Sequence, residues 1–168
     1  MNNETRFAAP WSTAVKVITF VTVLVLFGAA LVVPTLMPAG TPALARWTIA
    51  IGLPLIVLGT LPFLVRGYVI ERGELRILRL GWHNRIPLAE VVAVTADSDA
   101  MRGSLRLCGS GGLFGFFGWF RNRSLGVYRA YATDPRQAVV IKLRQRTVLV
   151  TPENPAAFVA ELNRQRGA

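Results

Sequence analysis

Hydrophobic and polar positions divide the chain into two contrasting parts. Residues 17–37 and 47–65 form two uncharged apolar runs, and the sequence after them alternates short apolar segments with turn signals. Each run is long enough to cross the roughly 30 Å hydrocarbon layer of a bilayer as a helix, for which about 20 residues are needed. Two prolines and a glycine within residues 38–42 separate the runs. The pattern therefore predicts a two-helix transmembrane hairpin over residues 17–65.

The positive charges near the ends of the two runs predict the orientation of this hairpin. Arg46 alone lies on the turn side. The basic residues on the terminal side are Arg6, Lys16, Arg66, Arg72, Arg76 and Arg79. Because Lys and Arg are retained in the cytoplasm more readily than they are translocated, we expect a multi-pass protein of the cytoplasmic (cell) membrane with both termini cytoplasmic. Residues 1–16 are then a cytoplasmic N-terminal segment.

Two other interpretations of the apolar runs are less favoured. A secretory signal peptide has a shorter apolar region than residues 17–37, and here a second run follows at once. Neither run carries an ionisable residue, which argues against a transporter, proton path or channel built from the hairpin.

Residues 67–168 have the pattern of one small β domain that ends in a helix. The expected strands are residues 68–70, 75–80, 86–95, 105–108, 126–132, 138–144 and 147–151. Asn154 is a good N-cap and Pro155 suits the first helical position, while Phe158 and Leu162 belong to one apolar stripe. We therefore predict an α+β fold, with about seven antiparallel strands in a barrel or sandwich capped by one C-terminal helix.

This layout and several motifs resemble the bacterial PH-like (pleckstrin-homology-type) domain family found in small membrane proteins. The stretches that carry the resemblance are residues 79–82, 86–88, 109–118, 121–126, 128–133 and 151–155. The resemblance implies a PH-like fold next to transmembrane helices, without catalytic residues and without a settled ligand. The basic first hairpin of eukaryotic phosphoinositide-binding members is only partly matched, by Arg72, Arg76 and Arg79, so that specificity is not carried over.

The segment from Gly109 to Phe120 combines glycines with more aromatic surface than an ordinary loop exposes. It follows the expected strand at residues 105–108 as a loop, and three interpretations stay open. It could be a bent strand pair whose aromatics fill the core, a membrane-facing wedge, or an interface with a partner or a second copy. The candidate membrane or partner surface consists of Phe114, Phe116, Phe117, Trp119, Arg121, Arg123 and Arg129.

Charge and composition limit the function classes. The net charge of +10 comes almost entirely from scattered arginines, which suits anionic headgroups better than nucleic acid. His83 is the only histidine and falls in an expected turn, where a surface role is favoured over that of a general base. Cys108 is the only cysteine, which leaves neither an internal disulfide nor a thiolate zinc site, and we expect it to be a buried small residue. Asp97 and Asp99 could mimic a cation site, but without further ligands at regular spacing they are more typical of a solvated loop. We therefore expect a non-enzymatic protein that binds neither a cofactor nor a metal.

Two functions remain open at the inner face of the membrane. The first is a non-enzymatic interaction or assembly module that binds a protein partner or copies of itself. The alternative is a lipid-sensing or lipid-orienting module that contacts anionic headgroups through the aromatic loop and arginines. An accessory subunit of a transporter or secretion complex would behave like the first.

Overall fold

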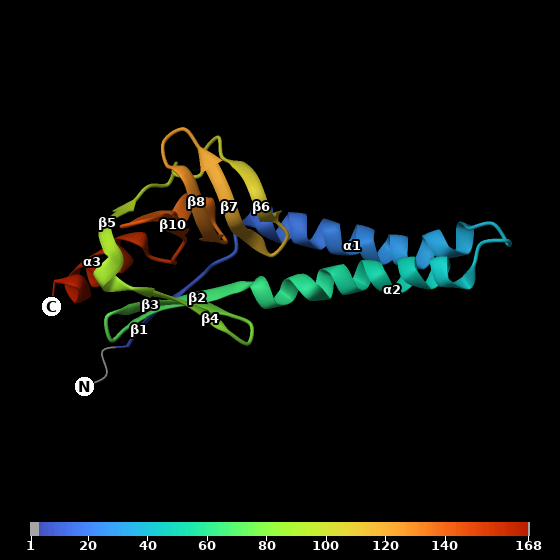
Figure 1. The fold of residues 1–168 in the computed structure, drawn as a ribbon, viewed down its shortest axis with the longest axis horizontal. Coiled ribbons are helices and arrows are strands. Elements are labelled where there is room, and N and C mark those ends of the chain that lie inside the picture. The colour runs from blue at the N-terminus through green and yellow to red at the C-terminus, as the bar shows by residue number, and fades with distance from the viewer. Residues whose placement is uncertain (1–3, 168) are drawn as a thin grey trace.

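Two long helices leave one end of a β domain side by side in the computed structural model, which describes residues 4–167 (Figure 1). Helix α1 spans Thr13–Leu36 and α2 spans Ala43–Thr60, followed by the 3₁₀ turn η1, Leu61–Phe63. Both helices are long and apolar enough to cross a membrane, and only a small share of either is buried. They are therefore not core helices of the domain. The two helices extend a few residues beyond the predicted apolar runs toward the chain start.

The first sheet has four strands in the order β1-β2-β3-β4. These strands are β1 Thr5–Ala8, β2 Val65–Glu71, β3 Glu74–Arg79 and β4 His83–Pro87. All pairs are antiparallel, and the predicted first hairpin forms with Glu71 opposite Glu74. Because β1 precedes α1 and β2 follows α2, the pairing of Phe7 with Tyr68 joins both bases of the helical hairpin to one sheet.

The second sheet has six strands in the order β5-β9-β10-β8-β7-β6. Their bounds are β5 Val91–Ala96, β6 Leu105–Gly112, β7 Gly115–Asn122, β8 Gly126–Ala132, β9 Val139–Leu143 and β10 Thr147–Val150, with the 3₁₀ turn η3, Pro135–Gln137, between β8 and β9. Strand β10 lies parallel to β8, whereas the sequence predicted antiparallel pairs throughout. The difference arises because the chain after β8 passes through η3 and places β9 one strand away from β8. Strand β10 then lies between them, antiparallel to β9 and parallel to β8.

The core lies between the two sheets and is closed at one end by helix α3, Pro155–Arg166 (Figure 1). Asn154 caps this helix as predicted, its side chain accepting a hydrogen bond from Ala157 N. Phe158 is fully buried, and its ring meets those of Phe7 and Tyr68 edge-on at 5.1 and 6.0 Å. The predicted order of helical hairpin, β domain and capping helix is confirmed, and the sheets form a sandwich rather than a closed barrel.

Residues 86–95 do not form the single strand predicted. They comprise the end of β4, a 3₁₀ turn η2 at Leu88–Glu90, and β5 in the other sheet. Leu88 is buried, and its N–H donates to the carbonyl of Gly73 at 2.8 Å. Pro87 has no N–H to continue the ladder, and the chain passes between the sheets immediately after it.

The segment predicted as a loop after residue 108 is instead a β-hairpin. Strand β6 continues to Gly112 and pairs with β7, with a register shift between Arg106 and Cys108. Gly109 and Gly118 face each other at positive φ angles, and a Cβ on either would overlap the carbonyl group of the opposite strand. The bent, bulged strand pair is thus the interpretation that describes this backbone.

Strand β1 was not predicted at all. Residues 5–8 are too few for an alternation pattern to stand out, and the strand exists because β2 offers an edge beside it. Its Thr5 hydroxyl donates to Glu161 on α3 at 3.2 Å. The N-terminal segment therefore contributes to the same sandwich as the residues after the hairpin.

Candidate functional site at the hairpin end of the sandwich

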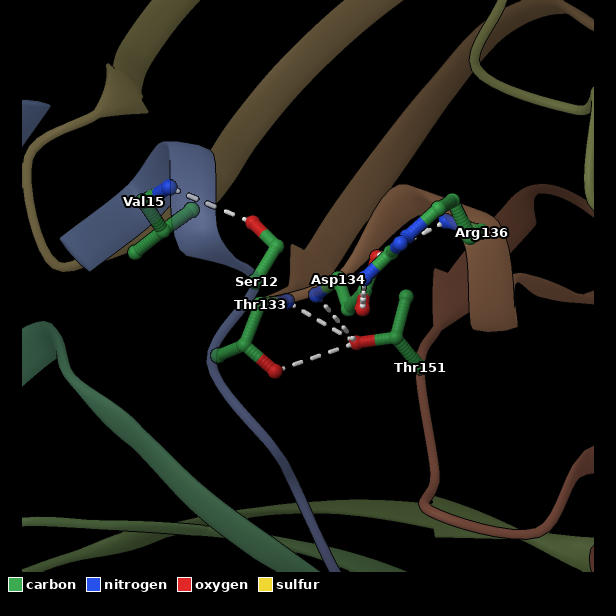
Figure 2. A network of polar contacts seen from close by, with 6 residues as sticks. All are labelled: Ser12, Val15, Thr133, Asp134, Arg136 and Thr151. Atoms are coloured by element: carbon green, nitrogen blue, oxygen red, sulfur yellow. Dashed lines mark hydrogen bonds and ion pairs between the residues drawn. The ribbon is translucent and has the colours of Figure 1, made fainter. Parts of the chain in front are cut away.

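The start of α1 is tied to the second sheet through backbone and hydroxyl groups (Figure 2). The Ser12 side chain caps the helix by accepting from Val15 N at 3.2 Å, while Ser12 N donates to the carbonyl of Thr133 at 3.1 Å. Thr151 accepts from Thr133 N at 2.8 Å. Because these groups are buried, breaking one would leave a polar atom without a partner, which is costly.

Two further contacts hold the next turn of α1 against the tip of the β6–β7 hairpin. The buried hydroxyl of Thr19 accepts from Phe114 N at 2.9 Å and donates to the carbonyl of Gly112 at 3.4 Å. Phe114 is itself buried, with its ring 6.0 Å from that of Trp11. The domain is therefore held in one orientation relative to the helical hairpin.

A pocket of about 580 Å³, which we call the junction pocket, lies beside the end of α2. Its lining joins the end of the hairpin to the β6–β8 part of the second sheet. The lining residues are Thr60, Phe63, Arg79, Arg106, Cys108, Gly109, Ser110, Leu113, Phe117, Gly118, Trp119 and Arg129. Three of them are arginines, and no Asp or Glu is among these lining residues.

Arg79 is the most unusual residue of the junction pocket. Only 7% of its surface is exposed, and its guanidinium carbon lies 4.5, 5.0 and 5.7 Å from the ring centres of Trp82, Tyr131 and Phe63. Burial lowers its pKa below the usual range; Tyr131 opposes part of this shift, and the nearby charge of Arg129 adds to it. Its Nε atom is buried without a hydrogen-bond partner among the described residues.

Arg129 stands beside Arg79 across the same aromatic ring. Its guanidinium carbon lies 5.4 Å from the ring centre of Tyr131 and 5.7 Å from that of Trp119. Phe63 stacks on Phe117 at 5.9 Å, which brings the end of the hairpin into contact with β7. The pocket thus combines cationic groups with aromatic walls.

The arginines of the first hairpin are in a different situation. Arg72 and Arg76 form ion pairs with Glu71 at 3.1 and 3.2 Å, and Arg76 also approaches Glu74 at 3.5 Å. Arg79 is at the other end of β3 and faces the junction pocket. The three arginines that matched part of the phosphoinositide pattern therefore do not form one site.

The structure gathers some members of the predicted surface and separates others. Phe117, Trp119 and Arg129 line the junction pocket. Phe114 packs at the hairpin tip and Phe116 against the outer cluster around Phe120 and Tyr128.

Arg121 and Arg123 lie elsewhere, at the far end of the same hairpin. Arg121 is six residues along β7 from Gly115, or roughly 20 Å away at about 3.3 Å per residue. Arg123 follows in the turn to β8, and both side chains are exposed. They line a hollow of their own with Leu105 and are not among the residues that line the junction pocket.

Sequence reasoning missed Phe63, Arg79 and Arg106 as members of one site. Phe63 was counted within the second apolar run, and Arg79 was counted toward the membrane orientation, the family resemblance and the partial phosphoinositide pattern, but not as part of a pocket. Arg79 continues the buried positions Leu75 and Ile77 of β3. An arginine at a core position of an alternating strand was the available signal.

The structure also places the other candidate chemical groups, which are His83, Cys108, Asp97 and Asp99. His83 is the first residue of β4, not a turn residue, and its Nε2 accepts from Arg85 at 2.9 Å. Cys108 is exposed on β6, whereas the sequence suggested a buried position. Asp97 accepts from Asp99 N at 2.9 Å within a turn. Among residues 4–167 no group of His, Cys, Asp and Glu is arranged to hold a metal ion.

A two-sheet sandwich with a C-terminal helix across one end defines a PH-type domain, joined here to an apolar helical hairpin. The family model for the bacterial PH domain matches residues 66–166, so the chain belongs to the bacterial PH domain family. PH-type domains are in general non-catalytic. Neither a curated protein nor a solved structure shows a significant match to this chain.

Proposed function

We propose that this protein is a non-enzymatic binding module that its helical hairpin anchors in the cytoplasmic membrane, with the PH-type domain at the inner face. The apolar lengths of α1 and α2 and the charge distribution support this placement. Arg46 is the only ionisable side chain near the hairpin turn, whereas Lys16 and Arg66 flank the domain end.

The domain in this proposal is oriented so that its hairpin end rests on anionic headgroups. The observation that carries the proposal is the fixed attachment of α1 to the second sheet through Ser12 and Thr19. An arginine near an anionic leaflet contributes about 1 kcal/mol. Such a contribution is small beside the hairpin anchor, so headgroup contact serves to orient the domain and not to recruit it.

Self-assembly through strand β6 is a second candidate function. Strand β6 is an edge of the second sheet, and its outer side has no strand partner among the described residues. Leu105 and Leu107 on this strand are 72% and 56% exposed. A free edge with apolar side chains is suited to pairing with another chain. Charge introduced by Leu107→Glu should then lower the mass of the detergent-solubilised protein in light scattering.

The placement at the inner face can be tested with the native Cys108, which is exposed. We expect a membrane-impermeant maleimide to label Cys108 in inverted membrane vesicles and to leave it unlabelled in intact cells. The matched control is Gly40→Cys in a Cys108→Ser background, because a Cβ at Gly40 meets nothing within 4 Å. The control should show the reverse pattern. Labelling of Cys108 from outside intact cells would contradict the proposal.

A further inference from the structure

The junction pocket contains a buried cation that the described residues leave without a counter-ion. None of Arg79, Arg106 and Arg129 has a hydrogen bond or ion pair with a carboxylate in residues 4–167. Burying an unpaired charge is costly, and aromatic rings around a guanidinium offset only part of that cost. An anion that accepts from Arg79 would complete the site.

The surroundings of the pocket indicate where such an anion comes from. Thr60 and Phe63 on its wall belong to the end of α2, and Leu113 belongs to the hairpin tip that contacts α1 at Thr19. In the proposed placement, this level of α1 is where the uncharged run begins, at the boundary between headgroups and acyl chains. The pocket therefore lies at the depth of lipid phosphates in this placement.

The lining also favours one headgroup charge over another. Arginine presents a planar fork of donors that matches phosphate oxygens. A zwitterionic lipid adds an ammonium group, for which the lining residues offer no carboxylate. The rings of Phe63, Phe117 and Trp119 provide apolar surface for the glycerol and upper acyl region.

We infer that the junction pocket binds the phosphate of an anionic phospholipid from the inner leaflet, with Arg79, Arg106 and Arg129 as the phosphate-binding residues. The inference rests on the proposed function, because it requires the hairpin end of the domain to face the bilayer. Its ligand is a phosphate ester, which a soluble glycerol phosphate would share, so the source needs a test of its own.

The test uses the full chain in detergent and native mass spectrometry with phosphatidylglycerol and phosphatidylethanolamine of identical acyl chains, since the quaternary ammonium of a choline lipid could bind the aromatic walls. We expect the wild type to bind phosphatidylglycerol at least about tenfold more tightly than the zwitterionic lipid, because phosphatidylglycerol has no ammonium group. Arg79→Gln, Arg106→Gln and Arg129→Gln should each weaken phosphatidylglycerol binding by about ten- to a hundredfold, as expected for loss of a charge-assisted hydrogen bond. Arg79→Lys should retain an intermediate affinity.

Arg146→Gln is the matched control, since it removes the same charge from an exposed position in the turn between β9 and β10 and Arg146 is not among the residues that line the junction pocket. We expect it to change binding by less than about twofold. Circular dichroism identifies any variant that fails to fold. Arg79→Gln is the variant with the greatest risk of misfolding, because Arg79 is buried. If it does not fold, the variants of the less buried Arg106 and Arg129 decide whether the pocket binds the lipid.

Each contrary result overturns a defined part of the account. Unchanged phosphatidylglycerol binding in folded Arg106 and Arg129 variants would mean that the lipid binds outside the pocket, while the proposed headgroup contact would stand. Displacement of the lipid by millimolar glycerol phosphate or inorganic phosphate would assign the pocket to a soluble phosphate. Equal binding of the two lipids by the wild type would contradict both the pocket assignment and the headgroup contact.

Discussion

The two ends of the sandwich are filled in opposite ways. At the α3 end, Phe7, Tyr68 and Phe158 pack edge to face, and the arginines of the neighbouring first hairpin are paired with glutamates. At the hairpin end, Arg79 occupies the space between the sheets within a group of aromatic rings and has no carboxylate partner among the described residues. One end is complete within the chain, whereas the other retains a pocket and uncompensated charge. Stability should therefore depend mainly on the α3 end and binding mainly on the hairpin end.

The largest expected effect is at the α3 end. Phe158→Ala should lower the free energy of unfolding by about 3 to 5 kcal/mol, because it removes a fully buried ring. Phe63→Ala at the hairpin end should cost less than half as much, since Phe63 is 43% exposed. Denaturant unfolding of the two full-length variants in the same detergent measures the difference. Equal losses would contradict the contrast between the ends.

The next effect is a pH dependence that arises between the two sheets. Tyr68 donates to the carbonyl of Tyr131 at 2.6 Å, and burial raises its pKa from 10.0 to about 12. In the unfolded chain the phenol loses its proton first as the pH rises. The stability that this group carries is therefore fully present below pH 10 and is lost between pH 10 and 12, by roughly 2 to 3 kcal/mol.

Tyr68→Phe should remove most of this loss of folding stability at alkaline pH. A smaller part of the alkaline loss should remain, because burial also raises the pKa of Tyr128. Unfolding of both proteins between pH 8 and 11.5 measures the slopes. An unchanged slope in Tyr68→Phe would show that Tyr68 is not the group that titrates.

A smaller effect concerns the attachment between hairpin and domain. Thr19→Val keeps the shape of the side chain but removes the hydroxyl that bonds Phe114 N, at an expected cost of about 1 to 2 kcal/mol. Hydrogen exchange should accelerate at residues 110–116 and stay unchanged around α3. Thr48→Val is the control, because the Thr48 hydroxyl bonds only the Leu44 carbonyl within its own helix. Equal exchange in both variants would mean that Thr19 does not hold the domain.

The smallest effect is expected for the paired arginines of the first hairpin. Arg72→Gln removes an ion pair between the exposed Arg72 and Glu71, which keeps its ion pair with Arg76, and should change the unfolding free energy by less than about 1 kcal/mol. It should also leave phosphatidylglycerol binding unaltered, unlike Arg129→Gln. A loss of lipid binding in Arg72→Gln would relocate the binding site to the first hairpin.

Local patterns predicted much of the fold. The apolar hairpin, strand β8 and helix α3 were recognisable from runs, alternation and caps within single segments. What could not be predicted depends on contacts between distant segments. Strand β1 exists because β2 is beside it, and residues 86–95 divide because the chain changes sheets at η2.

The junction pocket shows the same limit for the site. Phe63, Arg79 and Arg129 lie far apart in the sequence and belong to η1, β3 and β8. The aromatic segment was singled out from the sequence, and the structure places Phe117 and Trp119 from it in the pocket. Arg121 and Arg123 follow those aromatics closely in the sequence, yet they line a separate hollow with Leu105 and are not among the residues that line the junction pocket.

The most direct test of the central claim compares the two ends of the domain in a bilayer. A spin label at Leu113→Cys marks the hairpin tip and one at Asn163→Cys marks α3, both in a Cys108→Ser background and in nanodiscs containing phosphatidylglycerol. We expect power saturation to show the Leu113 label accessible to oxygen and shielded from a water-soluble nickel complex, and the Asn163 label to show the reverse. Equal exposure of both labels to the nickel complex would contradict the account, because the hairpin end would then not rest on the membrane.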